Sequence, residues 1–138
     1  MARPNNWNQN IIDEFRANAG QVGGHFKGRK LLILHSTGAR TGQERVNPLA
    51  YARDGERLVV IASKGGADTN PHWYHNLVAH PEVEVEVGTE TIPARAAVAA
   101  EPDRTRLYDQ MVSEFPAFDE YRHKTKRVIP VIVLTPVK

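Results

Sequence analysis

The sequence predicts one domain of the mainly β (α+β) class, a six-stranded and mostly antiparallel barrel with helices on its outside. Two observations predict it. Short apolar segments separated by turn signals follow one another from residue 31 to residue 62, and a strictly alternating segment, residues 82–87, precedes a candidate hairpin partner. At 138 residues, without a repeat or a linker, the chain has the length of one domain, so we expect residues 1–138 to fold together.

The N-terminal half begins with a predicted amphipathic helix within residues 1–20. Apolar residues recur at helical spacing from Trp7 to Ala19, and Gly20 is a natural stop. Three strands follow, at residues 31–34, 45–53 and 58–62, with Asp54-Gly55 as a two-residue hairpin turn between the last two. They form a meander that ends directly at a glycine-rich loop.

The C-terminal half supplies the other three strands. Residues 82–87 read Glu-Val-Glu-Val-Glu-Val, the pattern of a strand with its glutamates in water, and residues 91–99 are the expected hairpin partner. Pro93 makes that partner an edge strand or places a bulge in it. Pro102 stands near the start of a second predicted amphipathic helix, and residues 129–135 are the closing strand.

Residues 62–77 are too polar for a core and too rich in glycine and aromatic residues for an ordinary linker. The Lys-Gly-Gly turn at residues 64–66 allows a ligand to approach the backbone closely, and its amides and ammonium suit an anion. Asn70 is the expected N-cap of a short helix, with Pro71 at its first position. The alternative is a surface turn leading to a helix that simply packs its apolar face on the sheet.

Charge is distributed unevenly, although the formal net charge is only +2. Residues 1–64 hold ten Lys/Arg and five Asp/Glu, a balance of +5, and the remainder carries −3. The basic residues cluster at Lys27, Arg29, Lys30, Arg40, Arg45 and Lys64. A small anionic ligand explains them better than a nucleic acid, because aromatic residues are not interleaved with the cations. Ordinary solvated surface cations are the alternative.

The composition restricts the chemistry. The chain has no cysteine, which excludes disulfides and thiolates, so any redox chemistry must belong to a bound cofactor. No apolar run approaches the roughly 20 residues of a membrane span, and the first ten residues do not form a signal peptide, so we expect a cytoplasmic protein. His72 and His75 lack a third ligand nearby, and we expect no metal site. His35, inside an apolar strand, is expected to be a satisfied core residue rather than a base.

Three sequence blocks stand in a fixed order, from about Lys30 through Val133: LLILHSTGARTGQERVNPLAYARDGERLVVIASKGG, NPHWYHNLVAHPEVEVEVG and FPAFDEYRHKTKRVIPVIVL. Together they resemble the deazaflavin-dependent nitroreductase family, in its FDOR-A-type branch of F420H2-dependent reductases and quinone reductases. The resemblance implies a split β-barrel related to FMN-binding pyridoxamine-phosphate oxidases. It also implies coenzyme F420, a 5-deazaflavin, as the cofactor, with FMN as the less favoured one.

The resemblance further implies which residues meet the cofactor. The turn at Ala39, Arg40 and Thr41, together with Arg45, meets its phosphate-bearing side chain. Ile61, Ala62, Ser63 and Lys64 lie against the deazaflavin and its tail, and the helix with Trp73, Tyr74, His75, Asn76 and Leu77 closes over it. From charge alone we infer that Lys27, Arg29 and Lys30 meet the polyglutamate tail.

Phe115, Phe118 and Tyr121 match positions that line the substrate pocket and are rich in tyrosine in nitroimidazole-reducing members. Two of the three lack a hydroxyl here, so quinones and enone lactones suit the pocket better than nitroimidazoles. Ser63 is the candidate to orient groups near the ring, and Tyr121 is the candidate to give a hydrogen bond or proton to the substrate. Ordinary packing under a loop is the alternative for all three aromatic residues.

Two classes of function follow. The first is an oxidoreductase that transfers a hydride from reduced F420 to a quinone, enone lactone or nitro compound. The second is a non-catalytic module that binds a deazaflavin or flavin, and an FMN-dependent oxidoreductase on the same barrel is a further alternative. We expect a monomer or homodimer with no nucleic-acid partner, whose N-terminal helix is a candidate for peripheral contact with the inner face of the cell membrane.

Overall fold

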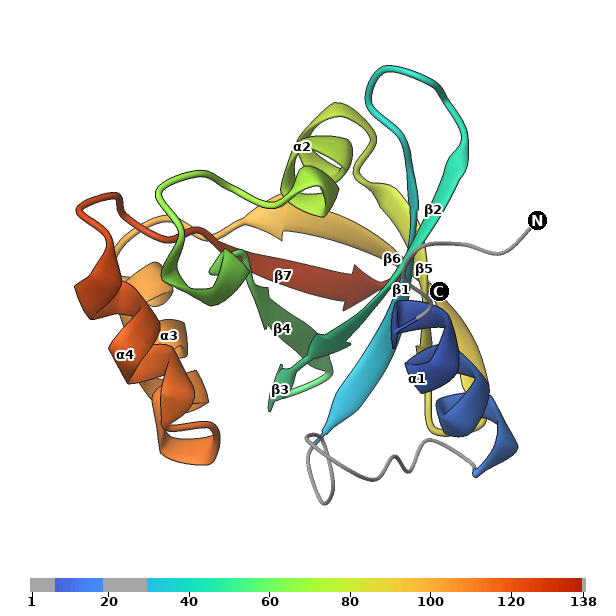
Figure 1. Cartoon of the computed structure of the whole chain (residues 1–138), viewed down its shortest axis with the longest axis horizontal. Coiled ribbons are helices and arrows are strands. Elements are labelled where there is room, and N and C mark those ends of the chain that lie inside the picture. The colour runs from blue at the N-terminus through green and yellow to red at the C-terminus, as the bar shows by residue number, and fades with distance from the viewer. Residues whose placement is uncertain (1–6, 19–29, 138) are drawn as a thin grey trace.

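One curled sheet organises the residues that this computed structural model describes, which are residues 7–18 and 30–137 (Figure 1). The elements are α1 (Trp7–Ala17), β1 (Leu31–Thr37), β2 (Glu44–Ala50), β3 (Ala52–Asp54), β4 (Arg57–Ile61), the 3-10 turn η2 (Lys64–Gly66), α2 (His72–Ala79), β5 (Glu82–Val87), β6 (Glu90–Val98), α3 (Asp103–Glu114), α4 (Ala117–Lys124) and β7 (Val131–Pro136). Seven strands pair antiparallel in the order β2-β1-β5-β6-β7-β4-β3. None of the described helices is long and apolar enough to cross a membrane.

The two edge strands of this sheet are consecutive in the chain. β2 ends at Ala50 and β3 begins at Ala52, so only Tyr51 separates them. One segment therefore pairs with β1 through its first part and with β4 through its second, which closes the sheet into a barrel. The sequence predicts one strand over residues 45–53 and six strands in total, and both predictions are wrong. The segment forms two strands, β2 and β3, because the chain bends at Tyr51 and buries the Tyr51 ring in the interior.

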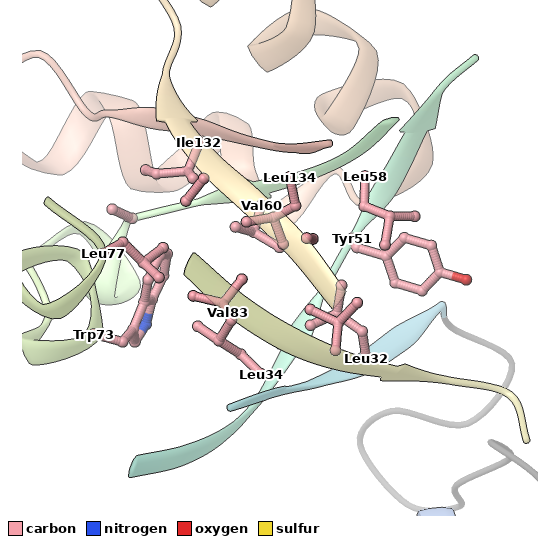
Figure 2. Close-up of a cluster of buried hydrophobic side chains, with 14 residues drawn as sticks. Leu32, Leu34, Tyr51, Leu58, Val60, Trp73, Leu77, Val83, Ile132 and Leu134 are labelled. Carbon is pink, nitrogen blue, oxygen red and sulfur yellow. The ribbon is translucent and has the colours of Figure 1, made fainter. Parts of the chain in front are cut away.

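Side chains alternate between the barrel interior and the outer surface along each buried strand. On β1, Leu32 and Leu34 belong to the interior, whereas Leu31 and Ile33 pack against α1 on the outside. The interior also holds Leu58, Val60, Val83, Val85, Ile132 and Leu134 (Figure 2). Strand β1 is apolar on both faces because each face has its own covering layer.

Helices α3 and α4 lie together on one side of the sheet (Figure 1). The core between them and the strands consists of Ala52, Val59, Ile61, Leu107, Tyr108, Met111, Phe115, Ile129, Val131 and Val133. Only α3 is predicted by the sequence. The eight-residue helix α4 has no buried residue, so its sequence lacks the apolar stripe from which a helix could be predicted.

Helix α2 closes one end of the barrel. Trp73 and Leu77 are 7% and 3% exposed and point into the interior cluster, so they do pack on the sheet (Figure 2). The predicted helix cap is wrong. The helix begins at His72 after Pro71, and Asn70 instead accepts a hydrogen bond from Arg127 Nη1 at 2.7 Å.

Strand β6 is not an edge strand, which corrects the expectation based on Pro93. It pairs with β5 on one side and with β7 on the other, in continuous register without a bulge. Pro93 lies where β7 ends, and its carbonyl accepts the N–H of Val137. The missing amide therefore removes a bond only from the last rung between these strands.

An ion-pair network holds α1 against the sheet. The helix stop expected at Gly20 lies outside the described residues. Arg16 donates two hydrogen bonds to Glu86 on β5, at 2.9 and 2.7 Å, and His35 Nε2 lies 2.5 Å from the same carboxylate. His35 is thus a satisfied residue, as expected. Glu86 is not part of a purely solvated glutamate row, and its hydrogen bond with Arg16 lowers its pKa to about 2.

Replacing Glu86 by glutamine tests this network. The folded-state pKa of about 2 lies below the ordinary value of 4.5, so the pairing contributes stability that is complete above pH 4.5 and is lost as the pH falls toward 2. Because solvent screens the pair, we expect Glu86→Gln to lower the free energy of unfolding by about 1–2 kcal/mol at neutral pH and by almost nothing near pH 2. Urea unfolding across this pH range measures the difference.

The matched control is Glu82→Gln on the same strand, whose side chain is 86% exposed. It should change the free energy of unfolding by less than about 0.5 kcal/mol at any pH. Equal losses for Glu86→Gln at both ends of the pH range would contradict the ion-pair assignment.

Candidate functional site

The loop between β4 and α2 has an uncommon backbone. Ser63 is right-handed at φ −77° and ψ −36°, and Lys64, Gly65 and Gly66 follow at φ 51°, 64° and 88°. Left-handed geometry at a non-glycine residue costs roughly 1–3 kcal/mol, so the surroundings must hold Lys64 there. A right-handed residue followed by a left-handed one turns successive amide N–H groups toward one point, which is how a backbone binds anions.

Arg127 holds the carbonyl groups of this loop, and it is not among the residues predicted for the site. Its guanidinium donates to three carbonyl oxygens of the loop, those of Ala62, Ser63 and Ala67. Arg127 ends the polar run RHKTKR, in which several cations look alike. No local sequence signal therefore distinguishes it.

Helix α4 packs directly on the loop backbone. A Cβ atom on Gly66 would lie 2.9 Å from Lys124 Cβ and 3.0 Å from the carbonyl oxygen of Tyr121. Just beyond the helix, Thr125 Oγ1 donates to Asp68 at 2.8 Å. Only glycine fits at position 66. The packing of α4 on Gly66 places the backbone of the predicted substrate residue Tyr121 beside the loop.

The predicted substrate-side aromatic residues form a row. The Phe118 ring meets the Phe115 ring at 6.1 Å and the Tyr121 ring at 5.3 Å, both edge to face. Phe115 is 5% exposed and belongs to the core under α3, so it serves packing. Phe118 and Tyr121 are half-buried, and the Tyr121 hydroxyl has no hydrogen-bond partner among the described residues.

A second tyrosine, Tyr108 on α3, supports this row. Its hydroxyl donates to the carbonyl of Phe118 at 2.6 Å. Burial raises the pKa of Tyr108 to about 12, so it stays protonated and acts as a structural donor. The sequence shows Tyr108 only as part of an apolar helical stripe, which hides this role.

The turn between β1 and β2 and the start of β2 carry the residues predicted to meet the phosphate. The Ala39 N–H donates to Asn76 Oδ1 at 2.9 Å, which ties the turn to α2. Arg40, Thr41 and Arg45 are exposed, and neither arginine has an ion-pair partner within residues 7–18 and 30–137. Both charges are therefore available to a ligand.

The predicted lid helix α2 has two faces. Trp73 and Leu77 are taken up by the core, and Asn76, 8% exposed, is occupied by its bond to the turn. The rings of Tyr74 and His75 meet edge to face at 5.4 Å and are half-buried and exposed, respectively. Of the five predicted residues on this helix, Tyr74 and His75 are therefore the two whose side chains are not taken up by the core or the turn.

The end of β4 is covered by protein atoms. Ile61 and Ala62 face opposite clusters with buried side chains, and both backbone groups of Ala62 are used, by Pro130 and by Arg127. The hydroxyl of Ser63 has no hydrogen-bond partner in the described part of the chain. Ser63, although only 6% exposed, is therefore the first side chain after the strand with an unbonded polar group among the described residues.

These donors fit an elongated anionic cofactor. Within the described residues, the Lys64 ammonium has only the Thr69 hydroxyl, at 3.2 Å, as a hydrogen-bond partner, and Arg40 in the turn and Arg45 in β2 have no ion-pair partner. Lys30 lies at the opposite end of β1 from the turn and pairs with Glu114 at 3.2 Å, so the structure does not bring it together with these cations. The other two residues assigned to the tail, Lys27 and Arg29, lie outside the described residues.

An apolar groove of about 200 Å³ lies beside the C-terminal half of α2. It is lined by Leu77, Val78, Pro81, Ala96, Ala97, Val98 and Ile132. It shares only Leu77 with the predicted site and contains no charged side chain, so it is not suited to the anionic part of a cofactor.

Metal coordination has no support from the described residues. Within residues 7–18 and 30–137, no group of three or more His, Cys, Asp or Glu side chains is placed to hold a metal ion. His72 and His75 are both exposed on α2.

Comparison with known sequences matches almost the whole chain. A family described as F420H(2)-dependent quinone reductase matches residues 7–136. The F420H(2)-dependent quinone reductase Rv1261c of Mycobacterium tuberculosis is 43% identical over 126 residues, which are 88% of this chain and 84% of that protein.

Comparison with solved structures is consistent with this family match. An F420-H2 dependent reductase, FDR-A, is 33% identical, with a TM-score of 0.72 over 81% of this chain and 99% of that chain. A structure described as a domain-swapped dimer is 31% identical, with a TM-score of 0.73 over 91% of this chain and 92% of that chain. The predicted fold class, a mainly β split barrel with flanking helices, is confirmed.

Alanine substitutions at two adjacent glycines test the packing of α4 on the loop. Both glycines have positive φ, but a Cβ at Gly65 meets nothing within 4 Å, whereas one at Gly66 meets α4. We expect Gly65→Ala to cost about 1 kcal/mol of stability and Gly66→Ala about 1–3 kcal/mol more, because α4 must move. Urea unfolding of both variants measures this, and equal losses would show that α4 does not press on the loop.

Proposed function

We propose that this chain, which belongs to the F420H2-dependent quinone reductase family, binds reduced coenzyme F420 at the barrel rim and promotes hydride transfer to a quinone. The observation that carries the assignment of the site is the loop at residues 63–66. It combines a nest-forming backbone with a serine hydroxyl that has no partner among the described residues, and the aromatic helix α4 packs against it. When bound, the deazaflavin supplies the hydride, from its C5 atom.

The loop is assigned to one part of the cofactor, and the exposed cations Arg40 and Arg45 are assigned to another. We assign Ser63 to hydrogen bonding at the ring and the nest amides, with Lys64, to a negatively charged group of the cofactor. Arg40, Thr41 and Arg45 meet the phosphate-bearing chain. The remaining predicted residues have two roles. Tyr74 and His75 cover the ligand. The turn, the strand end and the lid helix are held in place by Ala39, Ile61, Ala62, Trp73, Asn76 and Leu77.

The acceptor is assigned to the α4 side of the loop. Phe118 and Tyr121 offer ring faces and edges against which a planar quinone packs favourably. We assign the hydroxyl of Tyr121, which has no hydrogen-bond partner among the described residues, to donate to a quinone oxygen. Phe115 supports the row from the core. Because this row carries a single hydroxyl, we favour quinones over nitroimidazoles as acceptors.

Oxidation of reduced F420 by menadione tests the function. We expect the protein to accelerate the reaction well above the buffer rate, with saturation in both reactants. Tight F420 binding without acceleration would instead support a non-catalytic binding module. A parallel fluorescence titration that finds tighter binding of FMN than of F420 would support an FMN-dependent enzyme.

Two alanine variants test the cation assignments. Arg45→Ala and Lys64→Ala should each weaken F420 binding by about tenfold and make it less dependent on salt, because each removes a charge assigned to an anionic group. The control is Arg95→Ala, an exposed cation on β6 whose nearest carboxylate, that of Glu82, is 3.7 Å away. Fluorescence titrations at several salt concentrations measure the effect, and wild-type values in both variants would mean that the tail lies elsewhere.

Assembly and location belong to the same proposal. The likeness to a domain-swapped dimer supports a homodimer over a monomer. A cytoplasmic protein that reduces a lipid-borne quinone must meet its acceptor at the inner face of the cell membrane, so peripheral contact follows from the proposed substrate.

A further inference from the structure

The guanidinium of Arg127 binds both ends of the predicted cofactor loop. Its Nε donates to the Ala67 carbonyl at 2.8 Å, and its Nη2 donates to the carbonyls of Ala62 and Ser63 at 3.2 and 2.8 Å. Its Nη1 donates to Asn70 Oδ1 at 2.7 Å. These acceptors run from the end of β4 to the residue that precedes Pro71 and α2, so one side chain spans the whole loop.

All four acceptors are neutral, and Arg127 has no carboxylate partner within residues 7–18 and 30–137. Hydrogen bonds from a charged donor are stronger than those between neutral groups, and Arg127 makes four of them to this loop. These contacts oppose the strain of holding Lys64 in the left-handed region.

Arg127 also determines which way the peptide groups of the loop point. In a trans peptide the C=O and the N–H of the next residue point in opposite directions. Since the carbonyls of Ala62 and Ser63 face Arg127, the amide groups of Ser63 and Lys64 face away from it. These are amides of the nest assigned to the cofactor.

We propose that Arg127 is a positioning residue for the cofactor site, which fixes the backbone of residues 62–70 so that the Ser63 and Lys64 amides face the ligand. The inference rests on the proposed function, because it names what orients the groups assigned to F420. Thr125 and the end of α4 bind the same loop, so the segment that carries Tyr121 also sets the loop geometry.

Substitutions of Arg127 test the proposal. Arg127→Lys keeps the charge but cannot reproduce the fork of donors, and Arg127→Ala opens a space that a free guanidinium ion can enter. The control is Arg106→Ala on α3, whose ion pairs with Asp54 and Asp103 do not involve the loop. All variants are studied as full chains.

We expect both Arg127 variants to raise the Kd for F420 by about tenfold or more, and the control to leave it unchanged. At saturating F420, kcat with menadione should change by less than about threefold, because the reacting groups are intact once the cofactor is bound. Millimolar guanidinium chloride should restore part of the affinity of Arg127→Ala, whereas sodium chloride of equal ionic strength should not.

Hydrogen exchange of the cofactor-free protein separates this inference from the proposed function. The Gly66 and Ala67 amides, which bond to the carbonyls of Ser63 and Lys64, should exchange faster in Arg127→Ala and at the wild-type rate in the control. Unchanged exchange in Arg127→Ala would overturn the inference, whether or not affinity falls. A wild-type chain that does not bind F420 would overturn the proposed function, and the exchange data would still decide whether Arg127 fixes the loop.

Discussion

Closure of the barrel at Tyr51 is the constraint on which the arrangement of the site depends. Because β2 and β3 form one bent segment, β1 and β4 are antiparallel to the same stretch of chain and end at the same rim. The β1–β2 turn and the loop after β4 therefore lie toward this end of the barrel, on either side of α2 (Figure 1), and Asn76 of α2 bonds the turn. Strand β7 runs antiparallel to β4, so the segment that precedes it, with Arg127, starts from this rim as well.

The support of the site comes from segments that are distant in sequence. Asn76 fastens the turn, Arg127 fastens the loop carbonyls, and α4 presses on Gly66. In the part of the chain that the structure describes, these bonds occupy the loop carbonyls and Asn76, whereas the Ser63 hydroxyl, Arg40 and Arg45 have no hydrogen-bond partner. A rim built in this way presents its donors before a ligand arrives, so little ordering is needed on binding.

The sequence predicts the parts of this structure that are local. Alternation and apolar runs locate β1, β4 and β5, and the Lys-Gly-Gly turn locates the loop. The bend at Tyr51 escapes prediction because it results from pairing with two strands that lie on either side in sequence. The cap at Asn70 fails for a similar reason, since Arg127, 57 residues away, takes its side chain. Glu86 belongs to an alternating row, and only the packing of α1 distinguishes it from its neighbours.

Lys64 explains why the loop needs support from behind. Glycine at this position would adopt φ 51° without strain, as Gly65 and Gly66 do beside it. A lysine there introduces a cost, but it adds an ammonium to the loop, and within the described residues the Thr69 hydroxyl is its one hydrogen-bond partner. The strain is local, whereas the bonds that offset it come from Arg127. The loop therefore combines a glycine pair with an exposed cation, which suits the anionic cofactor proposed for this site.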